Sequence, residues 1–407
     1  MPIKITRSIK SDLKYKDAKR EIFSDNEFVA ELKELSTKRG IEFNDAMAQC
    51  QKYLKEIAAR CTENRQFWGF MEFVVRKRII ERFDNIYYDK GKLGKINDIV
   101  RENILAIVPN HRSVFDFIIL AYVLVKETSF MPIILAADIF NRFPMGFFFR
   151  KTGAYFVRRN ETDELYHAVF RHYVMLILKY ELVHLFFIEG GRNKTGAYSE
   201  PKAGILRYII EGKKKYNVQK EIVFLPVNIS YDCVPESNVV IKENLSGERR
   251  SIFSSVSKYM GSGNLGNCYI NFGEPVYLSG FLNKIGTERE NIKILGHSLI
   301  DNIMSLVTVS PIALMCYTIN NKSSVSVADF NREFKYNFDK LSLSRKNIGY
   351  IELNNIPDYL SFANSNGIIN YNKDEGIISI DMNKKRIVEY YSNNIRHLLK
   401  ETSINMR

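Results

Sequence analysis

The N-terminal part of the chain, residues 25–88, has the hydrophobic pattern of helices. Apolar residues recur at intervals of three and four, and glycines are few. Within residues 65–83, one face of the predicted helix collects Phe67, Met71, Val74, Val75, Ile79 and Phe83. Five basic residues outnumber two acidic residues in the same stretch. A helix packed against a core is the common explanation of such a stripe, and a helix lying in a membrane interface is the alternative.

From about residue 97 to residue 278 the pattern changes to short β-like runs that alternate with helical ones. We predict strands at residues 104–108, 132–136, 154–157, 184–188, 221–229 and 269–272. Helical patterns fill the gaps, most clearly at residues 163–182 and 203–216. The alternation is typical of the α/β class. The predicted fold is therefore a mixed, mostly parallel sheet flanked by helices, with helical N-terminal and C-terminal regions.

These patterns divide the chain into three regions. Residues 1–95 form a helical N-terminal region that includes the candidate membrane-interface helix at 65–83. Residues 96–285 form the α/β domain in which we expect the chemistry, and residues 286–407 form a mostly helical C-terminal region. A chain of 407 residues with 45% apolar composition is long enough for one large core and a smaller packed unit.

The charge balance favours anionic partners. Lys and Arg number 59 against 46 Asp and Glu, a net charge of +13. Such a surface attracts phosphorylated metabolites, acidic carrier proteins, anionic lipid or nucleic acid. The five cysteines form no CxxC pair and the histidines are not clustered, so we expect a reducing compartment and no metal site.

The sequence also bears on membrane attachment. The N-terminus has charges throughout and no apolar signal core. The longest uncharged stretch, residues 303–319, is interrupted by Pro311 and is shorter than the roughly 20 apolar residues that span a bilayer. We expect no transmembrane helix, and we expect a peripheral protein at the cytoplasmic face of the membrane.

His111 is the first candidate for chemistry. It lies in Asn-His-Arg-Ser-Val-Phe-Asp, residues 110–116, between a predicted strand and an apolar run. Such turns at the edge of an α/β sheet often hold catalytic groups. Histidine can accept a proton near neutral pH, and a carboxylate such as Asp116 can hold its tautomer and stabilise the imidazolium. The structural alternative is a capping box, because Ser113 and Asp116 also match the pattern that opens a helix.

Two later segments carry cations suited to a phosphorylated substrate. Residues 153–159 end in Arg158 and Arg159, and arginine presents a fork of donors that matches phosphate oxygens. The structural alternative is a solvated surface pair.

The other segment, FFIEGGRNKTG at residues 186–196, continues an apolar strand into a basic glycine-rich loop. Glu189 and Gly190 open the loop, and Arg192 and Lys194 add positive charge. Glycines let backbone N–H groups approach an anion closely. A plain turn after a strand is the alternative, although a glutamate, two glycines and two cations are more than a turn requires.

A fourth segment completes a set with a known order. Residues 223–231, VFLPVNISY, form a strand interrupted by Pro226, which lacks a backbone donor and belongs at an edge or a bulge. The four segments NHRSVFD, GAYFVRR, FIEGGRNKTG and FLPVNISYD together resemble the glycerol-phosphate acyltransferase family, which includes membrane-associated bacterial enzymes and dihydroxyacetone-phosphate acyltransferases.

The resemblance continues beyond these segments. FGEP at residues 272–275, SLVTVSP at 305–311 and YYSNNIRH at 390–397 look like later parts of the same family, so the similarity covers roughly residues 65–400. It favours the glycerol-phosphate branch over the shorter lysophosphatidate acyltransferases. Asn193 and Lys194 depart from the pattern, since the family often has serine and arginine there.

The resemblance assigns a role to each candidate residue. It implies an HX4D motif in which His111 is the general base and Asp116 its orienting partner. It also implies that Arg158, Arg159, Arg192 and Lys194 hold a phosphate, with Arg159 and Arg192 foremost. Glu189 and Gly190 would shape the loop, and Pro226 would line the site.

The implied reaction transfers a fatty acyl group from acyl-CoA or acyl carrier protein to the sn-1 hydroxyl of glycerol 3-phosphate. The product, lysophosphatidic acid, would enter phospholipid synthesis. No cofactor and no metal is implied. Dihydroxyacetone phosphate or a lysophospholipid is the alternative acceptor.

Other classes of protein fit less well. Residues 261–266 spell GxGxxG, but a helical pattern at 251–260 precedes them and a strand follows, the reverse of the order that dinucleotide binding needs. A serine hydrolase needs GxSxG, which does not occur. A non-enzymatic basic protein that binds membrane or nucleic acid stays open, although the basic residues are dispersed and no nucleic-acid module is recognised.

Overall fold

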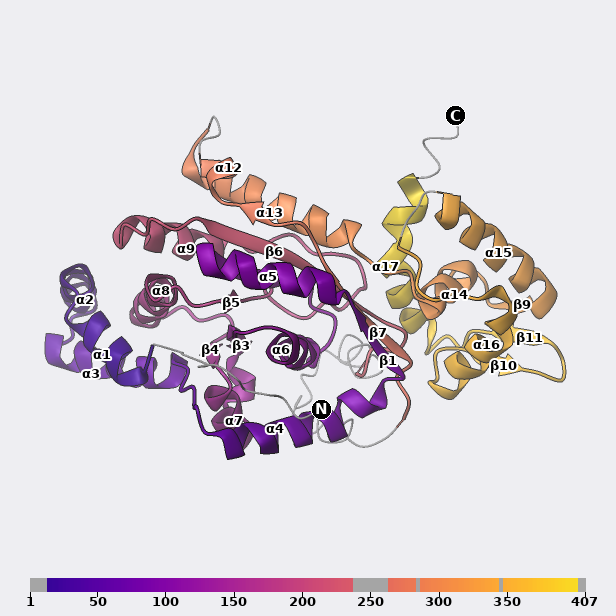
Figure 1. Ribbon diagram of the computed structural model, residues 1–407, viewed down its shortest axis with the longest axis horizontal. Coiled ribbons are helices and arrows are strands. Elements are labelled where there is room, and N and C mark those ends of the chain that lie inside the picture. The colour runs from indigo at the N-terminus through magenta and orange to yellow at the C-terminus, as the bar shows by residue number, and fades with distance from the viewer. Residues whose placement is uncertain (1–12, 237–262, 283–285, 344–346, 402–407) are drawn as a thin grey trace.

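A central β-sheet organises the computed structural model, which describes residues 13–236, 263–282, 286–343 and 347–401 (Figure 1). In these residues the sheet has eight strands in the order β1-β7-β6-β2-β5-β3-β4, with β8 also paired to β6. The pairs are parallel except that β7 and β8 run antiparallel to β6. The strands are β1 Asn85–Tyr88, β2 Ile104–Pro109, β3 Ile133–Ala137, β4 Ala154–Val157, β5 His184–Leu185, β6 Ile222–Tyr231, β7 Asn267–Phe272 and β8 Val276–Tyr277.

Helices cover both faces of the sheet, which explains the continuous apolar run of β2. Leu105 and Ile107 pack into the cluster under α5 (Lys90–Glu102) and α6 (Asp116–Glu127). Ile104, Ala106 and Val108 face the opposite cluster, under α8 (Glu164–Lys179), α9 (Gly204–Lys215) and α13 (Glu288–Ser305). Alternate side chains of a strand point to opposite faces, so a strand covered on both sides is apolar throughout.

The N-terminal helices extend the second of these layers. They are α1 (Tyr15–Phe23), α2 (Asn26–Arg39) and α3 (Phe43–Ile57). Apolar residues of all three belong to the cluster that contains α8. Ion pairs border this contact, including Arg171 with Glu31 at 2.6 Å and Lys38 with Glu164 at 2.6 Å. The predicted helical N-terminal region is therefore packed on the sheet domain.

The helix predicted at 65–83 is divided in two. α4 (Arg65–Arg78) is followed by a short 3-10 helix, η1 (Ile80–Arg82). Ile79 and Phe83 are buried and the rest of the apolar stripe is half-buried, so this face packs inward. Phe70 and Phe73, on the other side of α4, are 53% and 55% exposed. α7 (Met145–Lys151) lies beside α4, and η2 (Asp138–Asn141) precedes it (Figure 1).

The part of the C-terminal region that follows α13 packs as a smaller unit at one end of the sheet (Figure 1), whereas α13 itself covers the sheet. Its helices are α14 (Pro311–Ile319), α15 (Val327–Leu343), α16 (Ile356–Ser365) and α17 (Lys385–Glu401), with η3 (Leu353–Asn355) before α16. A short helix, α12 (Ser279–Leu282), precedes α13. The described residues also contain a small antiparallel sheet, ordered β10-β11-β9, of Ser324–Ser326, Asn370–Asn372 and Ile377–Ser379.

The predicted fold class is confirmed, with local differences that have physical causes. All six predicted strands form, but β5 stops at Leu185 because residues 186–189 turn into the loop above the sheet. β1 lies in a segment that we predicted as helical, and it is held by pairing with β7, a partner about 180 residues away. The three short strands β9, β10 and β11 lie in the C-terminal region that we predicted as mostly helical. The helical pattern predicted for residues 251–260 lies outside the described residues.

Candidate active site

Three loops meet at one edge of the sheet because their strands are neighbours. β6, β2 and β5 are adjacent and parallel, and they end at Tyr231, Pro109 and Leu185. Their carboxyl ends therefore lead into loops on the same side, the edge at which α/β sheets bind ligands. The loop after β2 carries His111, the loop after β5 carries Glu189 and Arg192, and the loop after β6 reaches Glu236.

His111 and Asp116 form a hydrogen-bonded pair. His111 Nδ1 lies 2.9 Å from Asp116 Oδ2, and the two side chains are 12% and 0% exposed. A carboxylate can only accept, so Nδ1 carries the proton and the Nε2 of a neutral imidazole keeps its lone pair. The ring stacks on Phe187, with centroids 4.0 Å apart and planes 20° apart. The arrangement fixes both the tautomer and the orientation of an imidazole whose Nε2 can accept a proton.

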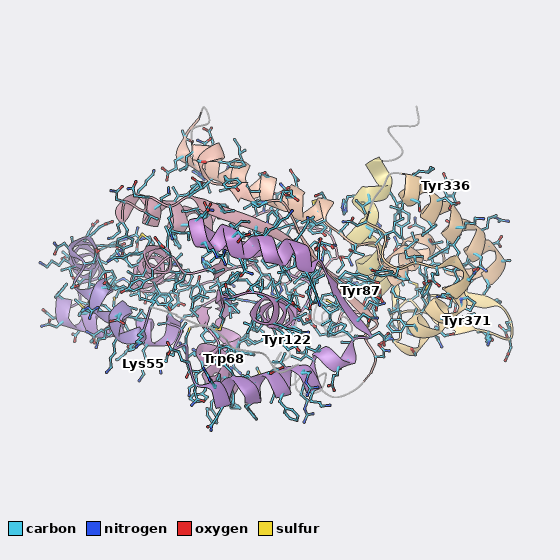
Figure 2. The ribbon with its side chains drawn as sticks, in the orientation of Figure 1. Lys55, Trp68, Tyr87, Tyr122, Tyr336 and Tyr371 are labelled. Atoms are coloured by element: carbon cyan, nitrogen blue, oxygen red, sulfur yellow. The ribbon has the colours of Figure 1, made fainter. Side chains whose placement is uncertain are left out.

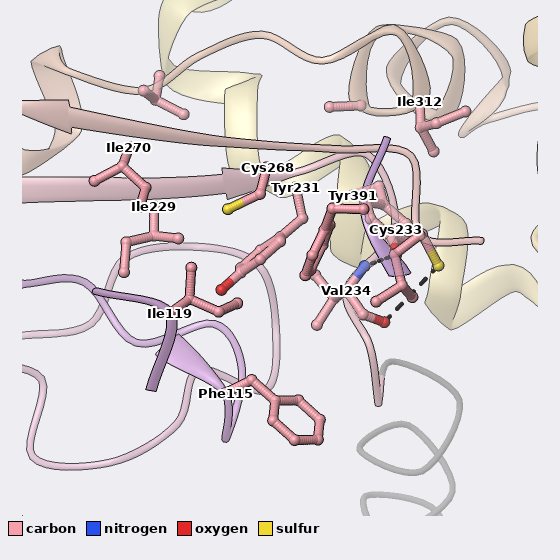
Figure 3. Close-up of a cluster of buried hydrophobic side chains, with 14 of the residues drawn as sticks. Phe115, Ile119, Ile229, Tyr231, Cys233, Val234, Cys268, Ile270, Ile312 and Tyr391 are labelled. Atoms are coloured by element: carbon pink, nitrogen blue, oxygen red, sulfur yellow. Dashed lines mark hydrogen bonds between the residues drawn. The ribbon is translucent and has the colours of Figure 1, made fainter. Parts of the chain in front are cut away.

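The Asp116 carboxylate is satisfied by donors from two segments. The backbone N–H groups of Arg112 and Ser113 donate to Oδ2 at 2.6 and 2.8 Å. The Tyr231 hydroxyl donates to Oδ1 at 2.6 Å, and in Figure 3 this hydroxyl points toward the side of Ile119 and Phe115. Burial and the charge of Asp116 raise the pKa of Tyr231 well above its usual value, so the hydroxyl keeps its proton.

The capping-box interpretation is half correct. Ser113 donates its backbone N–H to Asp116, as a capping box requires, but the Ser113 hydroxyl accepts from Phe115 N instead of Asp116 N. α6 begins at Asp116 without a side-chain cap. Asp116 therefore folds back over the turn that precedes α6 and holds His111 there.

Glu189 fixes the backbone of His111. Its Oε1 accepts from His111 N at 3.0 Å, while Asn193 N donates to His111 O at 2.8 Å. Glu189 Oε2 accepts from Asn193 Nδ2 at 3.0 Å, and Asn193 Oδ1 accepts from Gly196 N at 2.7 Å. Asn193, which departs from the family pattern, thus closes the glycine-rich loop internally.

Sequence analysis did not assign roles to two buried residues, Tyr231 and Glu236. Glu236 accepts from Ser113 Oγ at 2.7 Å, from Val114 N at 2.5 Å and from Arg192 Nη1 at 3.1 Å. Tyr231 lies within the fourth segment, and Glu236 lies five positions beyond it. The only sequence feature that points to these two residues is a long apolar strand, which ends at Tyr231 and is followed by Asp232 and Glu236.

The predicted phosphate ligands occupy different surroundings. Arg192 pairs with Glu236, and the two side chains are 8% and 4% exposed. Lys194 and Arg159 are exposed at the surface. Arg158 donates to both carboxylate oxygens of Glu56, at 2.7 and 2.6 Å, and to Glu161 at 2.8 Å. These carboxylates raise the pKa of Arg158 above its usual value.

Gly190 and Pro226 occupy positions that explain their residue types. Gly190 has a φ of +69°, and a Cβ there would lie 2.6 Å from Lys202 Cγ. Pro226 lies in β6 opposite Val108 of β2, and its carbonyl accepts from Gly273 N at 2.8 Å. β7 ends at Phe272 and β8 begins at Val276, so the missing donor of Pro226 falls at an interruption in the pairing. Whether Pro226 contacts substrate stays a prediction.

A pocket of about 390 Å³ lies between α4 and α6. Trp68, Met71 and Val75 line it from α4, and Phe117, Ala121 and Tyr122 line it from α6. Figure 2 labels Trp68 and Tyr122 on these two helices. Phe117 directly follows Asp116, so the pocket begins next to the residue that holds His111. Among the described residues, no group of His, Cys, Asp and Glu side chains is suited to hold a metal ion.

The chain is similar to acyltransferases over most of its length. The family model described as Acyltransferase matches residues 93–230, which contain three of the four segments and most of the fourth. The model described as Glycerol-3-phosphate acyltransferase C-terminal region matches residues 242–406. By these two matches the chain is a member of the acyltransferases. Within that class it belongs to the glycerol-3-phosphate acyltransferase family.

Curated relatives named glycerol-3-phosphate acyltransferase agree with this assignment. The relative from Pseudoalteromonas atlantica is 30% identical over 389 residues, 86% of this chain and 46% of the relative. The relative from Shewanella halifaxensis is 29% identical over 408 residues, 90% of this chain and 48% of the relative. This chain therefore spans about half the length of the curated relatives it matches.

A solved structure also aligns with the chain. It is the 1-acyl-sn-glycerophosphate acyltransferase PlsC from Thermotoga maritima, with a TM-score of 0.37 and 15% identity over 60% of this chain and 82% of that one.

The contact between α17 and the glycine-rich loop predicts that Gly196→Ala is destabilising. Gly196 has a φ of +82°, and an added Cβ would lie 1.9 Å from the backbone oxygen of Tyr390. Because the obstacle is helix backbone, we expect the variant to lose about 1–3 kcal/mol of unfolding free energy in chemical denaturation. Gly191→Ala is the control, since its Cβ would meet nothing within 4 Å. Equal unfolding midpoints for the two variants would contradict this contact.

Proposed function

We propose that the protein transfers a fatty acyl group from a thioester donor to the sn-1 hydroxyl of glycerol 3-phosphate. The observation that carries the proposal is the His111–Asp116 pair, which presents an oriented imidazole at the carboxyl edge of the sheet. The match of residues 242–406 to the C-terminal region of glycerol-3-phosphate acyltransferases supports this acceptor over a lysophospholipid. Dihydroxyacetone phosphate is the second candidate, because it offers a hydroxyl and a phosphate on the same three-carbon frame.

The chemistry needs no covalent enzyme intermediate. His111 Nε2 removes the proton from the acceptor hydroxyl, whose oxygen attacks the thioester carbonyl carbon. The tetrahedral intermediate then collapses, the carbon–sulfur bond breaks and the imidazolium returns the proton to the leaving thiolate. Asp116 stabilises the imidazolium between these two steps, as a buried carboxylate on Nδ1 does best.

Phosphate recognition falls to cations in the loop after β5 and at the end of β4. Arg192 and Arg159 are the foremost ligands, and Lys194 of the glycine-rich loop adds a further cation. Arg158 can join them only by leaving two carboxylates, Glu56 and Glu161. Either donor, acyl-CoA or acyl carrier protein, is a polyanion that the net charge of +13 attracts.

The pocket between α4 and α6 is the proposed site for the acyl chain. Its lining is predominantly apolar, as a hydrocarbon requires, and it starts beside the first turn of α6, where the thioester carbonyl must lie. The depth of this pocket would then set the preferred chain length.

The proposed location is the surface of an anionic membrane, with α4 and α7 facing the lipid. Phe70 and Phe73 of α4 are exposed, and so are Phe143, at 86%, and Phe147, at 49%. Phe148 of α7 stacks on Phe67 of α4, and Lys151 lies over Phe67 and Phe147, so the two helices form one aromatic and basic surface. Such a surface suits the interface of an anionic bilayer. In the described residues, no helix is both long and apolar enough to cross a membrane.

His111→Ala tests the reaction. The variant removes the base, so we expect kcat to fall by about 100-fold to 10,000-fold in an assay that follows radiolabelled lysophosphatidic acid. Acyl-CoA and acyl carrier protein thioesters are each tested with glycerol 3-phosphate and dihydroxyacetone phosphate. His297→Ala is the control, because its side chain is 54% exposed and belongs to α13.

Two outcomes would count against the proposed function. Full activity of the His111→Ala protein would remove the general base from the mechanism. If the wild-type protein formed no product from any donor and acceptor pair, a non-enzymatic binding role would be favoured.

Ala121→Phe tests the acyl pocket. A phenyl ring at this position of α6 fills part of the pocket, so we expect the kcat/KM ratio of long-chain to short-chain donors to fall by about tenfold or more. Ala48→Phe is the matched control on the exposed side of α3. An unchanged chain-length profile would place the acyl chain elsewhere.

Phe143→Ser combined with Phe147→Ser tests the membrane surface. Each buried aromatic ring contributes about 1.5–3 kcal/mol to apolar transfer, so we expect roughly tenfold or greater loss of binding to vesicles that contain anionic phospholipid. Tyr336→Ser, in α15, removes an equally exposed aromatic, at 65%, from the C-terminal region as a control. Equal vesicle binding by both variants would reject this surface.

A further inference from the structure

Glu236 connects the two parts of the site that the acceptor must reach at once. Its Oε2 accepts from Ser113 Oγ at 2.7 Å, and its Oε1 accepts from Val114 N at 2.5 Å. Both donors belong to the loop between His111 and Asp116. The same Oε1 accepts from Arg192 Nη1 at 3.1 Å, in the loop after β5. One carboxylate therefore bonds the loop of the base and an arginine of the phosphate loop.

The burial of Glu236 makes these bonds obligatory. The residue is 3% exposed, and the Arg192 side chain is 8% exposed. A buried carboxylate without its donors costs several kcal/mol, as does a buried guanidinium without its anion, so neither group can swing free at small cost. Burial raises the pKa of Glu236, and the charge of Arg192 opposes that rise.

The bonds of Glu236 between Arg192 and the His111 loop matter because of the shape of the acceptor. In glycerol 3-phosphate the reacting hydroxyl and the phosphate are joined by a three-carbon chain, so the base and the phosphate cation must lie at a matching separation. Binding energy from a remote phosphate raises the rate only when it places the hydroxyl in line with its base. A bond network that fixes Arg192 relative to His111 meets that requirement.

We propose that Glu236 is a positioning residue, which holds Arg192 at a fixed place beside the His111 loop so that one acceptor molecule engages both. The inference rests on the proposed function and adds to it a residue that contacts neither the hydroxyl nor the thioester. It acts through Arg192 on the phosphate and through Ser113 and Val114 on the loop of the base.

Glu236→Ala and Glu236→Gln separate geometry from charge. Alanine removes all three bonds. Glutamine keeps Oε1 for Val114 and Arg192, and its amide can donate to Ser113 Oγ, because a hydroxyl both donates and accepts. Glu236→Gln should therefore retain most of the positioning, whereas Glu236→Ala should lose it.

The measured quantity is the ratio of kcat/KM for glycerol 3-phosphate to kcat/KM for glycerol, which offers the same hydroxyl without a phosphate. We expect Glu236→Ala to lower this ratio by about tenfold or more, mainly through the KM of glycerol 3-phosphate. Glu236→Gln should stay within about threefold of the wild-type ratio. A general loss of folded protein lowers both activities together and leaves the ratio unchanged.

Asp232→Asn is the matched control. Asp232 is a buried carboxylate four positions earlier, and it accepts from Asn267 N at 2.8 Å rather than from the site loops. We expect it to leave the ratio unchanged. If Glu236→Ala also leaves the ratio unchanged while His111→Ala abolishes transfer, the positioning role is wrong and the proposed function stands. If the wild-type protein forms no product from any donor and acceptor pair, the proposed function itself fails, whatever Glu236 does.

Discussion

The buried carboxylate of Asp116 is the interaction on which the rest of the site depends. An ionised carboxylate with no solvent exposure is tolerated only when hydrogen bonds replace its water, and here four donors do so: His111 Nδ1, the backbone N–H groups of Arg112 and Ser113, and the Tyr231 hydroxyl. The same bonds set the turn before α6, the tautomer of His111 and the position of the end of β6. The hydrogen bonds that fold this turn therefore also orient the imidazole of His111.

Two further buried acids extend this arrangement to the neighbouring loops. Glu189 accepts from the backbone of His111 and from Asn193, and Glu236 accepts from Ser113, Val114 and Arg192. Each acid lies in the loop that follows a strand next to β2, so the sheet order brings it into reach. Because an acid that loses its donors stays buried and charged, each loop stabilises the conformation of the next. Glu189, His111 and Asn193 lie in segments that resemble the family, whereas Glu236 lies beyond the fourth segment.

Features that depend on residues close together in the sequence were predictable. Apolar runs located the strands, and the positions of His111, Asp116 and Glu189 after such runs placed them at one edge of the sheet. Partners set by distant pairing were not predictable: β1 pairs with β7, Arg158 meets Glu56 from α3, and Glu236 reaches the loop after β2. The type of one residue does not indicate which residue, about 100 positions away, it will contact. The incomplete capping box at Ser113 shows the same limit. Asp116 also accepts a hydrogen bond from Tyr231, which is distant in the sequence, so the local pattern alone could not predict its bonds.

Arg158 and Arg192 form different ion pairs, and this difference separates their roles. Arg158 meets two carboxylates, Glu56 and Glu161, and its ring contacts with Tyr53 and Tyr166 hold it against α3 and α8. To bind Arg158, a phosphate would have to displace both Glu56 and Glu161 from its guanidinium. Among the described residues, Arg192 pairs with Glu236, which already belongs to the site, so a phosphate can add to that pair without dismantling it. On the proposed function, Arg192, which reaches the loop of His111 through Glu236, is therefore the better phosphate ligand. Arg158, bonded to Glu56, chiefly holds α3 in place.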